Sequence, residues 1–221
     1  MPWSDAADWW LEEVDADPAY EAVVTPLLFE LLVPQPGTLY LDLGCGEGRV
    51  MRRIVAEGAR VHGVDLNLGL AARTGAPSLV AYLSNLPLKD DSYDAAYAPL
   101  VVEHITDHRR FFTEAARVVR PGGVLVVVSN HPFWTAPNST PIVDEGGETL
   151  WRPGEYFSEG ATEVPAGETS ITFHHRTMAE LLDAAADAGW SLERMIETPH
   201  HEIEDQQGIP RLLGCRWRLL P

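Results

Sequence analysis

Short apolar runs alternate with amphipathic segments along most of this chain. The first amphipathic segment spaces its apolar residues at intervals of three and four, which predicts a helix with one face in the core. These residues are Tyr20, Val23, Val24, Leu27, Leu28, Leu31 and Leu32. Asp17 and Pro18 give this helix an N-cap followed by a first-turn proline. Pro26 predicts a kink in the helix, and Pro34 predicts its end.

Beyond residue 37 the sequence predicts strands and helices in alternation. The predicted strands cover residues 38–43, 60–65, 78–83, 92–98 and 124–129. The predicted helices cover residues 49–57 and 67–74, a segment capped by Thr106 and Asp107, and a segment capped by Thr177. This alternation favours a parallel α/β sheet. The last two predicted strands, 191–198 and 214–220, have no helix between them and predict an antiparallel hairpin at one edge.

Residues 130–172 interrupt this alternation. They are rich in proline, glycine and acidic residues, with scattered aromatic side chains. A connection of this length is unusual in a compact domain unless it has a function or a structure of its own. The sequence therefore predicts a lid or an insertion with local structure here.

Charge changes the picture of what the chain binds. Its 221 residues fit one domain, and 16 Lys and Arg against 33 Asp and Glu give a net charge of −17. Such a protein repels polyanions at long range, which argues against a nucleic-acid substrate. The charge is uneven, because residues 1–37 carry eight acids and no Lys or Arg, while residues 38–138 carry ten of each sign. Residues 139–170 carry seven acids and only Arg152.

The two cysteines, Cys45 and Cys215, form neither a zinc site nor a disulfide framework by number or spacing. A reducing cytoplasm is therefore the expected location. No apolar run reaches the ~20 residues that a membrane span needs. The N-terminal residues are acidic and do not resemble a signal peptide.

The strongest local signal is the motif LDLGCGEGR at residues 41–49. Gly44, Gly46 and Gly48 lie where a predicted strand turns into a helix, so the backbone can bend sharply and a ligand can approach main-chain N–H groups. The spacing of these glycines departs from the G-x-G-x-x-G pattern of dinucleotide sites. Asp65 ends the second predicted strand, where a carboxylate can accept hydrogen bonds from ribose hydroxyls. Together these features predict a nucleotide-like site.

With these motifs the chain resembles the class I S-adenosylmethionine-dependent methyltransferases, specifically their small stand-alone bacterial type. LDLGCGEGR and GVDLN, at 63–67, match the first two motifs of the family. The segments 85–105 and 117–132 match the stretches around the fourth and fifth strands. The resemblance implies a Rossmann-like fold with a seven-stranded, mostly parallel sheet, an antiparallel last hairpin, helices on both faces and a cap.

The resemblance also implies how the cofactor is held. Gly44, Gly46 and the neighbouring Cys45 would hold the methionine part of S-adenosylmethionine, and Asp42 would support that loop. Asp65 would bind the ribose.

The adenine site follows from the same resemblance. Leu66 would pack on the adenine, Leu83 would offer it a backbone N–H, and Ala98 would offer a carbonyl to the cofactor's amino group. The family often has Asp where this chain has Tyr82, so the Tyr82 hydroxyl, Ser84 or packing alone would hold the adenine amine here.

A histidine beside the methyl group can act as a general base that deprotonates the acceptor. Three histidines are candidates: His131 just past the fifth strand, His175 leading into the helix after the lid, and His104 after the fourth strand. For each of them the alternative is a hydrogen-bonded structural histidine. The sequence shows no convincing metal-ligand spacing, so no metal is predicted.

Aromatic residues in the two acidic segments are candidates to cover the substrate, because their faces attract apolar and cationic groups. The candidates are Trp3, Trp9, Trp10, Trp134, Trp151 and Tyr156, with Trp10, Trp134 and Tyr156 as the expected substrate contacts. The alternative is ordinary packing of helices.

The sequence thus predicts a single methyltransferase domain. Residues 1–37 would form an N-terminal helical cap segment, 38–129 the cofactor-binding core, 130–172 a lid insertion, and 173–221 the final helix and edge hairpin. The predicted function is transfer of a methyl group from S-adenosylmethionine to an O or N atom of a small molecule.

The predicted partners follow from the charge of the cap. An acidic cap favours a neutral or cationic acceptor, with no nucleic acid and no membrane, in a monomer or homodimer. Three alternatives stay open: a nicotinamide-dependent oxidoreductase, a non-catalytic regulatory protein of the same fold, and a methyltransferase that acts on proteins.

Overall fold

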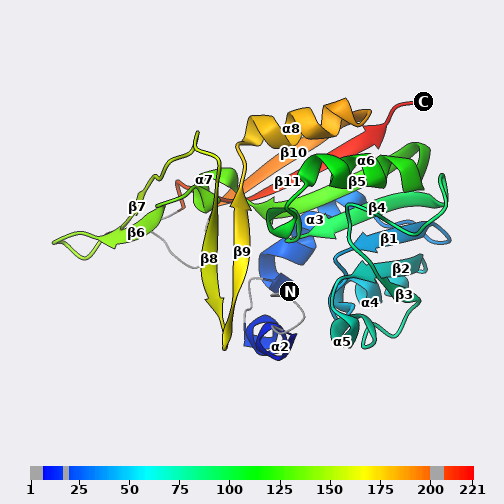
Figure 1. Ribbon diagram of the computed structural model, residues 1–221, viewed down its shortest axis with the longest axis horizontal. Coiled ribbons are helices and arrows are strands. Elements are labelled where there is room, and N and C mark those ends of the chain that lie inside the picture. The colour runs from blue at the N-terminus through cyan, green and yellow to red at the C-terminus, as the bar shows by residue number, and fades with distance from the viewer. Residues whose placement is uncertain (1–6, 17–19, 200–206) are drawn as a thin grey trace.

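Figure 1 shows a computed structural model of the chain, which describes residues 7–16, 20–199 and 207–221. The strands are β1 (Leu39–Leu43), β2 (Arg60–Asp65), β3 (Ser78–Val80), β4 (Tyr93–Pro99), β5 (Val119–Asn130), β6 (Thr140–Val143), β7 (Thr149–Arg152), β8 (Gly160–Ala166), β9 (Thr169–His175), β10 (Trp190–Pro199) and β11 (Pro210–Leu219). The α-helices are α2 (Ala7–Ala16), α3 (Thr25–Leu32), α4 (Arg49–Ala56), α5 (Leu68–Ala71), α6 (His108–Val118), α7 (Pro132–Thr135) and α8 (Met178–Asp187). Two shorter helical segments are the π-helix η1 (Tyr20–Val24) and the 3-10 helix η2 (Val102–His104).

Seven strands form one sheet in the order β10-β11-β5-β4-β1-β2-β3. The five strands from β5 to β3 are parallel to their neighbours, whereas β11 is antiparallel to both β5 and β10. The predicted fold class is therefore confirmed, including the antiparallel hairpin at one edge. The carboxyl ends of β1, β2 and β4 lie at the same edge of the sheet, which is where such folds bind ligands.

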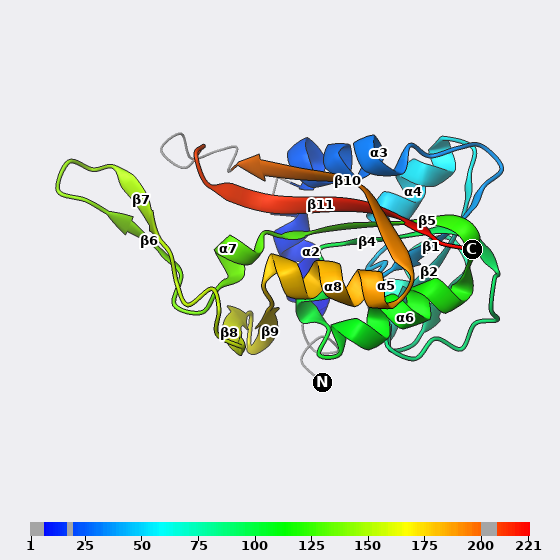
Figure 2. The same ribbon diagram turned by 90° about the horizontal axis from the view of Figure 1, so that it is seen from above.

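Helices cover both faces of the sheet (Figure 2). On one face, η1, α3 and α4 bury a cluster that includes Leu28, Leu31, Met51, Ile54 and Tyr97. On the other face, α6 and α8 bury a cluster that includes Phe111, Phe112, Leu181, Trp190 and Trp217. The Trp190 indole N–H within this second cluster donates to the Phe112 carbonyl at 3.1 Å, so the polar end of this buried ring is satisfied.

Several element boundaries differ from the prediction. The first predicted helix is split into η1 and α3, and Pro26 lies in the first turn of α3, where a proline costs no hydrogen bond. The start predicted for the first helix, at Asp17 and Pro18, lies outside the described residues. Trp3 also lies outside them. Strand β5 begins five residues early, because Tyr93 pairs with Val119 before residues 120–123 bulge out of the ladder. Helix α2 lies within the segment 1–37 that was predicted to be a helical cap, although no helix was placed at Ala7–Ala16.

The predicted lid, residues 130–172, contains α7 and two antiparallel hairpins with different positions (Figures 1 and 2). The hairpin β6–β7 projects away from the body of the protein as an arm. The hairpin β8–β9 lies beside α2 in Figure 1. Trp9 of α2 packs against the turn of this hairpin, with its Cβ 3.3 Å from the position that a Cβ on Gly167 would occupy. The two segments predicted to cover the substrate therefore contact each other through α2 and the hairpin β8–β9. The arm β6–β7 projects away from the body and takes no part in this contact.

Among the residues that the structure describes, we find no helix long and apolar enough to cross a membrane.

Candidate active site

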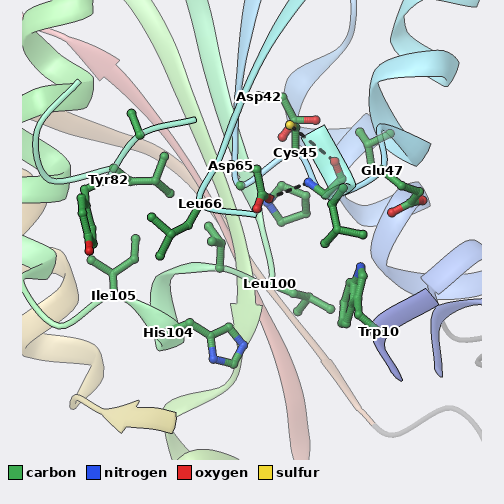
Figure 3. A pocket seen from close by; sticks show the side chains of 18 of the residues that line it. Trp10, Asp42, Cys45, Glu47, Asp65, Leu66, Tyr82, Leu100, His104 and Ile105 are labelled. Carbon is green, nitrogen blue, oxygen red and sulfur yellow. Dashed lines mark hydrogen bonds between the residues drawn. The ribbon is translucent and has the colours of Figure 1, made fainter. Parts of the chain in front are cut away.

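A cavity of about 530 Å³ opens at the carboxyl ends of β1, β2 and β4. This volume lies within the roughly 300–1,000 Å³ range of small-molecule sites. Its wall comprises the glycine turn after β1, the ends of β2 and β4, the segment after β3, η2 with the residues that follow it, and parts of α2, η1 and β9. Figure 3 shows Tyr82 at one side of the cavity, Trp10 at the other, and His104 between them in this view.

The glycine turn has a backbone conformation that other residues rarely adopt. Gly44 has φ +87°, and a Cβ added there would lie 2.5 Å from Val101 Cγ2. Gly48 has φ +84°, and a Cβ there would lie 2.7 Å from the backbone of Thr74. Glycine is thus required both by conformation and by space. As a result, the backbone of the turn lines the cavity at Gly44 and Gly46.

Asp65, at the end of β2, fastens this turn. Its carboxylate accepts hydrogen bonds from the Gly46 N–H and from the Asn67 N–H, both at 2.8 Å (Figure 3). Burial raises the pKa of Asp65, against the effect of these N–H donors. Each oxygen accepts one backbone bond, and a carboxylate oxygen can accept a second. Asp65 therefore combines a structural role that the sequence did not predict with capacity for a ligand hydroxyl.

Asp42, near the end of β1, brings a second carboxyl group to the cavity wall. The residue is 1% exposed, and neither carboxyl oxygen has a hydrogen-bond partner among the described residues. Burial raises the pKa of Asp42 well above its usual range, the nearby Tyr97 hydroxyl lowers it, and Asp65 and Glu47 raise it. A buried carboxyl group without a protein partner beside a ligand cavity fits a cationic ligand group.

The N-terminal segment closes the cavity next to the glycine turn. The Trp10 indole nitrogen lies 3.6 Å from where a Cβ on Gly46 would be, and Trp10 packs edge-on against Tyr20 at 6.3 Å between ring centroids. The Arg49 guanidinium lies 5.6 Å from the centre of the Tyr20 ring and 3.4 Å from the Glu47 carboxylate. The side chains of Trp10, Tyr20, Glu47 and Arg49 all line the cavity, and of these four only Trp10 was predicted to do so.

The predicted adenine contacts lie in one part of the wall, with one exception. Leu66, Tyr82, Leu83 and Ser84 all line the cavity. Ala98 is fully buried, and the cavity wall at the end of β4 is formed by the residues that follow Ala98, beginning with Pro99, the last residue of the strand. The structure therefore does not place Ala98 on the cavity wall, where its predicted carbonyl contact would require it.

At the other end of the cavity, η2 faces β9. His104 Nδ1 lies 3.0 Å from the Thr172 carbonyl oxygen, and Thr106 Oγ1 lies 3.4 Å from His174 Nε2. Since a carbonyl oxygen can only accept, His104 Nδ1 carries the proton of this hydrogen bond. The neutral His104 ring then has its lone pair at Nε2. Burial lowers the pKa of His174, and the positive charge of Arg176 lowers it further.

Two of the three predicted catalytic histidines do not line the cavity. His131 is buried, accepts from the Phe133 N–H at the start of α7, and pairs through Nε2 with Glu197 at 2.7 Å. His175 is buried with Thr135 Oγ1 and the Tyr156 carbonyl oxygen at its two ring nitrogens. Both correspond to the hydrogen-bonded structural histidines that the sequence left as the alternative.

Two predicted substrate contacts are corrected in the same way. Trp134 stacks on Trp151 with ring centroids 3.7 Å apart, and Arg211 lies over its ring at 4.6 Å from the ring centre. The Tyr156 hydroxyl accepts from the Met178 N–H at 3.0 Å, which attaches residues 153–158 to the start of α8. Neither aromatic residue lines the cavity.

The acids of residues 139–170 do not line the cavity either. Asp144 and Glu148 lie at the turn of the arm, where the Asp144 side chain accepts from the Glu148 N–H. Glu163 accepts from the hydroxyls of Ser170 and of Thr172, its partner on the neighbouring strand, but does not itself line the cavity. These acids therefore form no part of the cavity wall, and the predicted acidic cover over the substrate stays a prediction.

Fold and site together define a Rossmann-like protein that binds a nucleoside carrying a cationic group. The class follows from the glycine turn, Asp65 and the unpartnered Asp42 at the carboxyl edge of the sheet. S-adenosylmethionine meets these requirements, because it joins a ribonucleoside to an amino acid with an ammonium group.

Comparison with known proteins identifies the family. The sequence profile of a methyltransferase domain matches residues 41–127. A probable S-adenosylmethionine-dependent methyltransferase of Mycolicibacterium smegmatis is 35% identical over 191 residues, 75% of this chain and 72% of the relative. A demethylmenaquinone methyltransferase of Corynebacterium urealyticum is 31% identical over 155 residues, 69% and 63% of the two chains. The crystal structure of an S-adenosylmethionine-dependent methyltransferase from Mesorhizobium loti superposes with a TM-score of 0.79 at 29% identity, covering 87% of this chain and 96% of that one.

The chain belongs to the S-adenosylmethionine-dependent methyltransferases. It is an enzyme whose cofactor is S-adenosylmethionine, so the oxidoreductase and the non-catalytic alternatives fall away.

Trp10 offers a first test of the cavity wall. We expect Trp10→Ala to weaken the binding of S-adenosylhomocysteine about tenfold, which corresponds to about 1.4 kcal/mol, because an aromatic wall next to the glycine turn is lost. Calorimetry measures this affinity directly. Trp151→Ala is the matched control, since this tryptophan packs against Trp134 away from the cavity and its loss leaves the affinity unchanged. Equal affinities for the two variants would contradict the placement of α2.

Proposed function

We propose that this enzyme methylates an oxygen or nitrogen atom of a neutral or cationic small molecule, with His104 as the general base. The observation that carries the proposal is the hydrogen bond between His104 Nδ1 and the Thr172 carbonyl oxygen. It selects the tautomer with the lone pair at Nε2, in a side chain that lines the cavity. His104 would accept the acceptor's proton at Nε2.

The cofactor would occupy the half of the cavity next to the glycine turn. When bound, S-adenosylmethionine supplies a methyl group on a sulfonium, which a nucleophile takes in line as the carbon–sulfur bond breaks. Asp42 would hold its ammonium group and Asp65 its ribose. Leu66 and Tyr82 would contact the adenine, because both line the part of the wall beyond Asp65.

The side chains at the other end of the cavity, around His104, support an uncharged or cationic acceptor. Among the described residues that line the cavity, the one Lys or Arg is Arg49, which lies at the glycine turn beside Glu47. The wall around His104 consists largely of Leu100, Val101, Ile105 and Thr172. A phosphate or carboxylate acceptor would find no cationic side chain there.

The names of relatives point in the same direction. The relative from Corynebacterium urealyticum is a demethylmenaquinone methyltransferase, and a 33% identical relative from Rhizobium rhizogenes is a ubiquinone biosynthesis O-methyltransferase. We infer by analogy that flat aromatic hydroxyl compounds are suitable acceptors. The same proposal locates the enzyme in the cytoplasm, consistent with Cys45 and Cys215 both being free thiols.

A panel of phenols, hydroquinones and small amines with methyl-labelled S-adenosylmethionine tests the proposal. With the acceptor that is methylated fastest, we expect His104→Gln to lower kcat by roughly 10²–10⁴-fold, the range for a general base. The affinity of this variant for S-adenosylhomocysteine should stay unchanged, because the cofactor would lie at the other end of the cavity.

The control for this experiment is His131→Asn, which can still cap α7 and does not touch the cavity. We expect it to retain the wild-type kcat. A His104→Gln enzyme as fast as this control would refute the role of His104. Labelling of a basic protein but of none of the small molecules would refute the acceptor class.

A further inference from the structure

Arg176 follows β9 directly and is 9% exposed. Its guanidinium donates to three backbone carbonyl groups: Val102 at 3.0 Å, Thr106 at 2.9 Å, and Ile105. Burial lowers the pKa of Arg176 to about 10, while the carboxylates of Glu103, Glu180 and Asp107 oppose that shift. The side chain therefore stays protonated at neutral pH, and its N–H groups bind backbone carbonyl groups of one turn.

The three carbonyl groups belong to one short segment, residues 102–106. This segment carries His104, Ile105 and Thr106, which all line the cavity. Strand β9, just before Arg176, carries Thr172 and His174, which line the cavity from the opposite side. Arg176 thus joins two parts of the acceptor wall that are about 70 residues apart in sequence.

The segment 102–106 is also held from its other side. Glu103 is buried, and its carboxylate accepts from the backbone N–H of Asn130 at 3.1 Å and from the Asn130 side-chain amide at 2.6 Å. This contact attaches η2 to the end of β5. It does not fix the distance between η2 and β9. The guanidinium of Arg176 supplies that second constraint, because a planar fork bound to three carbonyl groups permits little rotation.

We propose that Arg176 is a positioning residue for His104. By fixing residues 102–106 against β9, it keeps His104 Nδ1 within hydrogen-bond distance of the Thr172 carbonyl group. That bond holds the imidazole in the tautomer whose Nε2 lone pair can accept a proton. The effect on the His104 tautomer is independent of the acceptor, whereas the effect on catalysis rests on the proposed function.

A purely structural role for Arg176 predicts lower stability with an unchanged His104. Long-range ¹H–¹⁵N spectra of the full-length protein with labelled histidine separate the two cases, because they report the protonated ring nitrogen. The His104 signal is assigned by its loss in His104→Gln. We expect wild type to carry the proton on Nδ1, and Arg176→Met to shift His104 toward the Nε2–H form.

Arg216→Met is the matched control. Arg216 also donates to backbone carbonyl groups, those of Leu31 at 2.7 Å and Leu32 at 3.4 Å, but it does so on the face of the sheet covered by α3. Its loss removes a comparable structural contact and should leave the His104 tautomer unchanged. If Arg176→Met folds and keeps the wild-type tautomer, the proposal is overturned.

Arg176→Lys keeps the positive charge but lacks the planar guanidinium. This variant is the test of the positioning role if Arg176→Met does not fold. A lower Nδ1–H population than in wild type supports the proposal, and an equal one overturns it. With a methylated acceptor available, Arg176→Met should lower kcat on the order of 10²-fold with unchanged affinity for S-adenosylhomocysteine. If His104→Gln leaves kcat unchanged while Arg176→Met still shifts the tautomer, the proposed function fails and the positioning role stands.

Discussion

Replacing Asp42 with asparagine is expected to weaken the binding of S-adenosylhomocysteine by roughly 10- to 150-fold. The buried Asp42 carboxyl group has no protein hydrogen bond among the described residues and lines the cavity beside the glycine turn. A hydrogen bond between a carboxylate and an ammonium group contributes about 1.5–3 kcal/mol, and asparagine removes its charge. Calorimetric titration measures the change. Glu114→Gln is the control, because Glu114 is buried, is bonded to Arg117 and does not line the cavity.

The raised pKa of Asp42 also predicts how many protons are released when the cofactor binds. Because its pKa is raised in the free enzyme, Asp42 holds a proton over a wider pH range than an exposed aspartate. A bound ammonium group favours the ionised form, so cofactor binding releases up to one proton and tightens as pH rises toward that pKa. Titrations in buffers of different ionisation enthalpy should show this release in wild type and its loss in Asp42→Asn. Identical proton counts and affinities in both proteins would show that Asp42 does not contact the ammonium group.

The free energy of unfolding should fall as pH rises, whereas the affinity for the cofactor should increase. Between the unfolded and the folded pKa of Asp42, the folded enzyme binds one proton more than the unfolded chain. Its free energy of unfolding therefore falls as pH rises through this window, by up to about 1.4 kcal/mol per pH unit from this group. Asp42→Asn lacks that contribution, so its stability relative to wild type should increase with pH.

The second large effect is expected for Gly44→Ala, which should lower the free energy of unfolding by about 2–5 kcal/mol and abolish measurable binding of S-adenosylhomocysteine. A residue with a Cβ pays about 1–2 kcal/mol in the left-handed conformation. The new methyl group would also lie 2.5 Å from Val101 Cγ2, and such overpacking costs about 1–3 kcal/mol. Chemical denaturation and calorimetry measure the two losses.

Two further variants separate these causes. Gly37 has φ +77° with no heavy atom within 4 Å of an added Cβ, so Gly37→Ala measures the conformational cost alone. Val101→Ala removes the clashing methyl groups, so Gly44→Ala with Val101→Ala should be more stable than the sum of the two single effects. Strict additivity would show that Val101 is not what excludes a side chain from Gly44.

The fold and the cavity wall at the glycine turn were predictable because they depend on local sequence. The alternation of apolar runs with amphipathic segments determines the α/β class, and Gly44, Gly46 and Gly48 form one short motif between a strand and a helix. The structural role of Asp65, in contrast, required the Gly46 N–H to be seen 2.8 Å away.

The acceptor half was predicted less well, because it depends on strand parity and on long-range pairing. His174 and His175 are adjacent on β9, where neighbouring side chains point to opposite faces. His174 lines the cavity and His175 is buried beside Thr135, and no sequence pattern distinguished them. Likewise, nothing in the sequence shows that the arm bearing Asp144 projects away from the body.

The position of β11 has a consequence for how the chain folds during synthesis. This strand comes last in sequence yet pairs with β5 and β10 and contributes Leu213 and Trp217 to a core cluster. During synthesis β11 is made after β5 and the five strands that follow β5, so the edge of β5 stays unpaired until β11 has emerged from the ribosome. The nascent sheet then has an exposed hydrophobic edge of the kind that chaperones bind. The rate of folding should depend on this final long-range pairing more than on the helices that form earlier.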